Sequence, residues 1–529
     1  MNRIEEWLEF YKDNKKATNQ IKKNALKYGN EIYNDSNLKV VNNAFVAQYL
    51  YLPLGFNELI IKKIAQCFLN YLRLKNLDIA NYYVVLATND YQNPIKKQIL
   101  SYLKEVLQSS KLKVLEFENN NNSSYSFLQY SILKMENVDY AFFIDDFLIE
   151  QKYFALNILA CQNPELQQEI ISYIQKQIND LYFEDISDFH DDSIKINTSK
   201  LINEYINDIL NFKFNKNANR IIKLGIIPNK SNKHLIRKAL GRDDISYQFL
   251  HTQINNKQNK IISWHQKFDY IIHFLNDDQS IKIFAPEKKG LKTIYKSIEF
   301  SNLLAIYLNF IYTNKSKNEN SIKIENLIYS FGTNNFLLNF IAKKMDLNQK
   351  ELKLLKNEKA FNIPNLLYLD EEQKFFITNP KIKEFDQLLQ AVILVDMLNY
   401  YKTQNMNITN LENDLEQEIN ITNLSKFEIK SLNTNLDHFK TKLFAQTELA
   451  KLNYNELIDL SKYQNETEKF VAKYEFEEEE WLVIKQDLVN ERLVFFVNET
   501  KKTKNNISNR LQKFFLRFLN KFNFNFSLD

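Results

Sequence analysis

The sequence predicts an α/β protein with three α/β domains and a smaller C-terminal α+β domain. Its 529 residues are too many for one ordinary domain. Short apolar runs rich in β-branched residues alternate with segments whose apolar positions recur at helical spacing, which is typical of layered α/β domains. Polar, turn-rich stretches separate these alternating units. We therefore expect four domains, at residues 1–190, 195–315, 320–430 and 431–529.

The first unit contains the clearest alternation. Residues 57–76 repeat apolar positions at helical spacing, and "YYVVLA" (82–87) is predicted to be a buried strand. We expect further strands at 112–117 and 140–144, and further helices at 94–109 and 125–136. The Asn/Ser run at 119–124 is predicted to be a solvated turn.

The later units continue the same pattern. For the second unit we expect a strand at 220–227, a helix near 232–240, strands within 268–284 and a helix at 297–311. For the third we expect strands at 322–329, 365–369 and 374–378 and helices at 333–344 and 385–402. The polar stretch 403–470 is predicted to be helical or irregular. Two strands, at 477–487 and 492–499, and a basic helix at 507–526 are expected to end the chain.

Composition and charge exclude several classes of protein. Two Cys exclude a disulfide framework and a cysteine-based zinc site, and they suit a reducing compartment. A net charge of +4 on this length is too weak to indicate nucleic acid or a membrane surface as partner. No apolar run reaches membrane-spanning length, and the acidic start of the chain lacks a signal-peptide core. We therefore expect a cytoplasmic protein with no transmembrane segment.

Glycine is unusually scarce. The chain has only six Gly, against a usual frequency of ~7%. Loops that grip phosphate with backbone N–H groups adopt conformations that only Gly reaches cheaply. The composition therefore argues against phosphate chemistry.

Four phrases nevertheless occur in a characteristic order. They are "GFNELII" (55–61), "FDYIIHF" (268–274), "DQLLQAVILVDMLNYYKTQNMNI" (386–408) and the pair "WLVI" and "RLVFFV" (481–497). In this order they resemble framework segments of the α-D-phosphohexomutases, the phosphoglucomutase and phosphomannomutase superfamily. The resemblance covers nearly the whole chain. It implies three α/β domains and a smaller fourth domain around one cleft.

The resemblance also implies a chemistry, which is phosphoryl transfer between a phosphoserine and a sugar beside a bound cation. The family's serine follows a strand that corresponds to "AFFI" (141–144), and Phe147 stands at its position. In the family's D-x-D-x-D-R metal loop, the aligned ligand positions hold Leu275, Asp277 and Gln279. Only Asp277 is a carboxylate there, and one carboxylate seldom holds magnesium. We therefore expect no cofactor, and Mg²⁺ only if the chain is an active mutase.

The two substrate loops are also altered. Glu371 and Glu372 match the acidic pair of the family's sugar loop, although a tight acidic turn between two strands explains them equally well. In the phosphate loop Phe496 replaces the Arg and Glu499 replaces the Gly, so only Thr500 remains. Glu371, Glu372 and Thr500 are thus the candidate substrate-binding residues.

These replacements favour a catalytically inactive relative, a pseudoenzyme with a binding, scaffolding or assembly role and a protein partner. Two alternatives stay open. One is an active phosphoglucomutase or phosphomannomutase type of intramolecular phosphotransferase acting on hexose phosphates. The other is a sugar-phosphate sensor that binds without turnover. The basic amphipathic helix at 507–526 is expected to pack on the last sheet, and a membrane or partner contact is its alternative.

Overall fold

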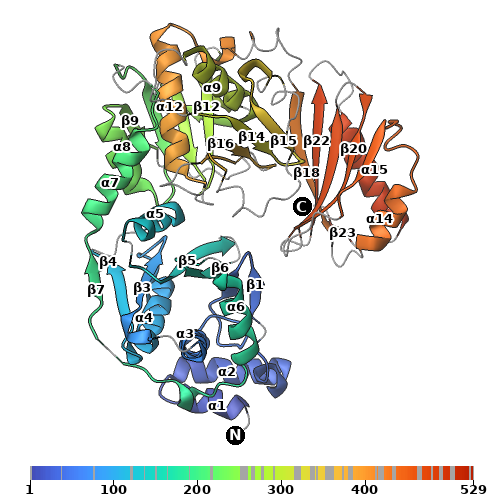
Figure 1. Ribbon diagram of the computed structural model, residues 1–529. Coiled ribbons are helices and arrows are strands. Elements are labelled where there is room, and N and C mark those ends of the chain that lie inside the picture. The colour runs from blue at the N-terminus through green and yellow to red at the C-terminus, as the bar shows by residue number, and fades with distance from the viewer. Residues whose placement is uncertain are drawn as a thin grey trace. The chain divides into compact units, whose positions relative to one another are not determined.

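The chain forms two compact units in the computed structural model (Figure 1). The first unit comprises Met1–Tyr205 with Lys230–Asn232, and the second comprises Ile206–Asn229 with Lys233–Asp529. The structure describes residues 3–527 except 37, 76–77, 119–122, 136, 149–151, 164, 190, 215–218, 251–259, 264–267, 276–278, 290–291, 299, 315–322, 334–339, 341–342, 352–362, 372–373, 379–384, 412–413, 415–421, 432–435, 462–467, 478–479, 488–491, 501–506 and 523–525.

The first unit is built on a seven-stranded mixed sheet with the order β1-β2-β6-β5-β3-β4-β7. Its strands are β1 (Lys39–Val41), β2 (Ala44–Gln48), β3 (Tyr83–Thr88), β4 (Lys113–Phe117), β5 (Tyr140–Leu148), β6 (Tyr153–Ala160) and β7 (Ile194–Ile196). β3 pairs in parallel with both β4 and β5, as expected for strands joined by crossover helices. β6 pairs with β5 in antiparallel fashion and was missed by the sequence prediction.

Helices cover this sheet. They are α1 (Arg3–Phe10), α2 (Lys15–Tyr28), α3 (Glu58–Leu74), α4 (Pro94–Ser109), α5 (Tyr125–Met135), α6 (Leu166–Gln177) and α7 (Thr198–Leu210), and the division between the units falls within α7. α3 is buried along most of its length, contacts α4 and α6, and carries Cys67 into the core. α4 has the predicted bounds. The Asn/Ser run is not a solvated turn throughout, because Ser123 and Ser124 are buried.

The second unit contains three sheets. The six-stranded sheet β10-β13-β12-β11-β8-β9 comprises β8 (Lys223–Ile227), β9 (Ser246–Phe249), β10 (Lys260–Ser263), β11 (Tyr270–Phe274), β12 (Ile281–Lys289) and β13 (Lys292–Ser297). The four-stranded sheet β15-β14-β16-β17 comprises β14 (Asn326–Tyr329), β15 (Asn348–Glu351), β16 (Leu366–Leu369) and β17 (Phe375–Ile377). Each has a parallel part and an antiparallel part.

The last sheet is antiparallel, with the order β19-β20-β21-β22-β18-β23. It comprises β18 (Thr422–Ser431), β19 (Glu456–Asp459), β20 (Glu468–Glu475), β21 (Trp481–Asp487), β22 (Arg492–Thr500) and β23 (Phe526–Ser527). The prediction that 403–470 is helical or irregular was therefore wrong for three strands. β18 begins before the expected domain start at 431, and its residues 422–430 pair with β22 of this sheet. Such long-range pairing leaves little local signal in a polar stretch.

The described helices of the second unit are α8 (Lys233–Arg242), α9 (Phe300–Asn314), α12 (Gln387–Thr403), α14 (Leu436–Phe444) and α15 (Ile507–Lys521). α12 is buried along nearly its full length beside α9 (Figure 1). Buried Asp396 fixes it by pairing with Arg220 at 2.9 Å. α15 packs Leu511 and Phe515 against β18 and β22, so the expected packing on the last sheet is confirmed. The expected helix at 333–344 lies mostly outside the described residues.

Candidate functional site

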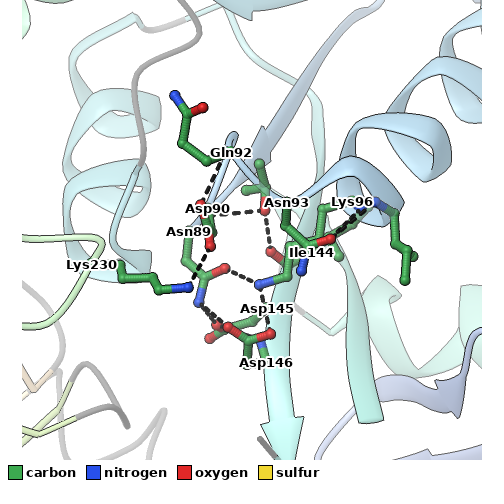
Figure 2. A network of polar contacts seen from close by, with 11 residues as sticks. Asn89, Asp90, Gln92, Asn93, Lys96, Ile144, Asp145, Asp146 and Lys230 are labelled. Carbon is green, nitrogen blue, oxygen red and sulfur yellow. Dashed lines mark hydrogen bonds and ion pairs between the residues drawn. The ribbon is translucent and has the colours of Figure 1, made fainter. Parts of the chain in front are cut away.

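The first candidate site lies at the carboxyl ends of β3 and β5 in the first unit (Figure 2). These strands are parallel neighbours, and Thr88 at the end of β3 is in register with Ile144 of β5. The polar residues at these strand ends therefore meet at one edge of the sheet, which is where α/β proteins commonly bind ligands. Asn89 and Asp90 follow β3, and Asp145 and Asp146 lie in the last part of β5.

Helix α4 brings a cation to this edge. Its Asn93 cap accepts hydrogen bonds from the backbone N–H groups of Ile95 and Lys96, and Pro94 starts the helix. The Lys96 side chain is fully buried, with its Nζ 2.8 Å from Asp146 Oδ1. It also donates a hydrogen bond to the side-chain oxygen of Asn89. The lysine ammonium thus neutralises a carboxylate inside the protein.

The remaining groups are satisfied by one another. Asn89 Nδ2 donates to Asp145 and lies 3.4 Å from Asp146 Oδ2. Asp90 accepts from the Gln92 backbone N–H at 3.0 Å and from Lys230 Nζ at 3.1 Å. Figure 2 shows these side chains directed toward each other. The described network is therefore a set of internal ion pairs and hydrogen bonds.

Phe147 extends strand β5. The register of β5 with β6 shifts between Asp146 and Leu148, so Phe147 is the extra residue of a β-bulge, and its side chain is half-buried. Two further tyrosines of the first unit are packed inside it. Tyr91 is buried, and the Tyr51 ring lies 5.3 Å from that of Tyr11.

A second candidate site, within the second unit, surrounds Glu371. This residue follows β16 in the turn before β17. Its carboxylate accepts a hydrogen bond from Lys485 Nζ of β21 at 2.6 Å and another from the Ser330 hydroxyl. Burial acts to raise the pKa of the Glu371 carboxyl, but the Lys485 ammonium and these hydrogen bonds outweigh burial, so the pKa is lowered. Glu371 is thus half of a buried ion pair between two sheets.

The segment beside Glu371 packs closely. A Cβ on Gly332 would lie 2.5 Å from Glu371 Cβ and 3.4 Å from the Phe496 ring. Phe496 itself is 1% exposed and packs with Phe331 and Trp481 in an apolar cluster. Phe496, which the sequence comparison aligned with the phosphate-binding Arg, therefore lies in an apolar core cluster.

The other candidate residues are those of the metal loop and of the two substrate loops. Asp277 and Glu372 lie outside the described residues. Thr500 lies in β22 opposite Thr422 of β18. The structure thus brings Glu371 beside the segment that carries Phe496, and Thr500 is four residues further along the same strand.

The described flanks of the metal loop do not fit a magnesium ion. Leu275 has no ligating side chain, and its carbonyl accepts hydrogen bonds from Asn229 and Gln387. The Gln279 side-chain oxygen accepts from Lys374 Nζ at 3.0 Å, so the oxygen that this aligned position would offer to a metal is already bound to an ammonium. Within the described residues, no group of three or more His, Cys, Asp or Glu side chains is arranged to hold a metal.

Sequence reasoning missed the lysines that complete both networks. Lys485 stands in the otherwise apolar run "WLVIK" of a buried strand, and that position is a detectable signal of a buried partner. Lys96 gave no comparable signal, because a lysine in the first turns of an amphipathic helix is usually solvated.

Comparison with solved structures identifies the fold. The chain is similar to a phosphoglucomutase/phosphomannomutase family protein from Burkholderia thailandensis, with a TM-score of 0.62 and 13% identity, over 90% of this chain and 96% of that chain. It is also similar to a putative phosphomannomutase from Thermus thermophilus, with a TM-score of 0.61 and 10% identity, over 91% and 99% of the two chains. The chain has the α-D-phosphohexomutase fold.

The predicted fold class is therefore confirmed. At these identities the phosphohexomutase fold alone is shown, and activity is a separate question. No protein-family model and no curated protein matches this sequence. Among the described helices, none is long and apolar enough to span a membrane.

Proposed function

We propose that this protein is a catalytically inactive phosphohexomutase homologue, located in the cytoplasm, that serves as a binding, scaffolding or assembly component for a protein partner. The observation that carries the proposal is the buried pair of Glu371 and Lys485 beside Phe496. Glu371, the described member of the acidic pair, is engaged by the protein itself, and Phe496, which aligns with the phosphate-binding Arg, belongs to an apolar core.

The nucleophile position supports the same proposal. Phosphoryl transfer through an enzyme intermediate needs a side chain that can carry phosphate, and Phe147 has no such group. The carboxylates of Asp145 and Asp146 next to it repel an incoming phosphate dianion. Lys96, the buried cation nearest to them, already pairs with Asp146.

The second network also supports the proposal, because releasing Glu371 from its ion pair costs free energy. For the Glu371 carboxylate to turn out of this network toward a sugar hydroxyl, it must give up a buried ammonium and a hydroxyl donor. Breaking such a pair leaves an uncompensated buried charge, which costs about 3–5 kcal/mol. A neutral hydroxyl returns much less than this, because its hydrogen bond to a charged group contributes about 1.5–3 kcal/mol.

A coupled assay tests the proposal. Purified protein is supplied with Mg²⁺ and glucose 1-phosphate or mannose 1-phosphate, and formation of the 6-phosphate is followed. We expect no turnover above a heat-treated control, and an intact mass without added phosphate. Turnover that is lost in the Asp277→Asn variant and retained in a matched Asp269→Asn variant would refute the proposal.

Thermal denaturation with sugar phosphates distinguishes the sensor alternative. A ligand present at 100 times its dissociation constant adds about 2.7 kcal/mol to stability, which is a measurable rise in melting temperature. We expect glucose 1-phosphate to have no more effect than glucose with inorganic phosphate. A larger effect of the ester, without turnover, would replace the proposal by the sensor.

The binding role has its own test. The tagged chain is purified from its source cells at physiological salt, and co-purifying proteins are quantified. A partner recovered in a fixed molar ratio supports the role, whereas recovery of the chain alone, with an assay that is also negative, counts against it.

A further inference from the structure

A pocket of about 450 Å³ lies in the second unit, and its lining residues belong to neither network. It is formed by α9, the C-terminal end of α12 and the segment that follows α12. Its wall includes Ile306, Asn309, Tyr400, Tyr401, Met406 and Asp414. This volume is within the ~300–1,000 Å³ typical of small-molecule sites.

The packing of the two helices fixes the aromatic wall. The Phe310 ring of α9 lies 5.1 Å from Tyr400 and 6.1 Å from Tyr401 of α12. The two tyrosine rings are 5.4 Å apart at 70° to each other. Two differently oriented tyrosine rings thus lie in the wall of one space, and tyrosine is one of the residues that hold organic cations by cation–π attraction.

Asn309 supplies an unsatisfied acceptor. Its Oδ1 is buried and has no hydrogen-bond partner in the described part of the chain. The side chain of Asn309 hydrogen-bonds the Tyr401 hydroxyl, which fixes the amide beside the pocket. A buried acceptor without a donor destabilises the empty protein. Because the terminal torsion of Asn is soft, a ligand N–H group at the wall can pair with this oxygen once the amide turns and gives up its hydrogen bond to Tyr401.

The charge of the wall favours a ligand with a positive charge. Asp414 contributes an exposed carboxylate, and the described wall contains no Lys or Arg. The available groups are thus an amide oxygen, a carboxylate and two tyrosine rings, together with the neutral polar side chains of Thr313 and Gln404. A planar cation with several N–H donors complements all of them at once.

We propose that this pocket is a binding site for a small amidinium, guanidinium or ammonium compound. The inference does not depend on the proposed function, since none of its residues belongs to either network or to the phosphohexomutase loops.

Benzamidine, benzamide and benzoate test this proposal as a matched series with one shape and three charges. Met406 is on the wall, and the chain has only five Met, so [¹³C-methyl]methionine NMR resolves its signal. We expect benzamidine to shift the Met406 methyl in a saturable way, with at least tenfold tighter binding than benzamide and no binding of benzoate. Equal binding of all three, or no shift up to about 10 mM, the range expected for ligands this small, overturns it.

Three variants locate the interaction. Asn309→Leu removes the acceptor and should weaken benzamidine at least tenfold. Asp414→Asn keeps the shape of the side chain, and it should not disturb folding because the residue is exposed. It should reduce the preference for benzamidine over benzamide at least threefold. Tyr312→Ser changes an exposed residue of α9 that is not part of the wall and should leave binding unchanged. Unchanged binding in both pocket variants would show that benzamidine binds elsewhere and would refute the assignment.

Discussion

Replacing Lys485 by Met removes the cation that compensates Glu371, and it keeps most of the side-chain volume. The carboxylate then remains buried, because its side chain is only 10% exposed and the lysine side chain 3%. Breaking a buried ion pair from one side costs about 3–5 kcal/mol, far more than the ~0.2–1 kcal/mol of an exposed pair. We expect Lys485→Met to destabilise the second unit by the larger amount.

The chain offers a matched control. Lys473 in the neighbouring strand β20 is also 3% exposed, but its partner Glu475 is 39% exposed. After Lys473→Met the orphaned carboxylate stays in water, so we expect a loss of at most about 1 kcal/mol. The double variant Lys485→Met with Glu371→Gln removes the buried charge, keeps an acceptor for Ser330, and should recover most of the loss.

The pH dependence has a definite sign. In the wild type the folded-state pKa of Glu371 is lowered. Its stabilising contribution is therefore present above the unfolded value of about 4.3 and is lost as pH falls through the folded value. In Lys485→Met burial dominates and raises the pKa, so the folded state binds the proton more tightly than the unfolded state. The deficit of the variant should shrink as pH falls from 7 toward about 5.

Urea denaturation followed by Trp481 fluorescence measures these differences. Trp481 lies four residues from Lys485 in β21, and the other two Trp are replaced by Phe so that the signal reports this sheet. Such local reporting matters because a chain of two compact units need not unfold in one step. A loss below about 1 kcal/mol in Lys485→Met, or a deficit that grows on acidification, would refute the reasoning.

Three further outcomes follow from the same contacts. Gly332→Ala should destabilise the second unit by about 1–3 kcal/mol, because the added Cβ meets Glu371. Gly241→Ala in helix α8 is the control, since the added Cβ there meets no atom within 4 Å. It should stabilise by up to about 1 kcal/mol in the same denaturation assay. Lys96→Met should lower the stability of the first unit by about 2–3 kcal/mol, measured by calorimetry. This is less than for a fully buried pair, because Asp146 is 26% exposed. Lys97→Met, at an exposed position of the same helix, should change the stability by less than about 0.5 kcal/mol. Burial raises the pKa of both cysteine thiols to about 12. Iodoacetamide at pH 8 should therefore label the native protein on the order of 10³-fold more slowly than the urea-unfolded chain. Labelling is followed by mass spectrometry, and equal rates would contradict this.

Much of the fold was accessible from local pattern. The helix at 94–109 was predicted to the residue, because a proline start, an Asn cap and apolar positions at helical spacing all lie within it. β18 was not predicted, because a polar strand is specified by its partner β22, about seventy positions later. The candidate site divides in the same way. Phe147 and Phe496 could be read as replacements, but Lys96 and Lys485 could not be assigned as the groups that complete the networks.

The sequence by itself determined the α/β class and the spans of the strongly periodic elements. Those properties depend on spacing and residue type along a short stretch of chain. Only the tertiary structure decided that Glu371 is held by Lys485 and that Lys96 lies between Asn89 and Asp146. Whether a carboxylate can bind a ligand depends on which side chains of other segments lie beside it and on how deeply it is buried from water. Both are set by strand order and packing between distant segments.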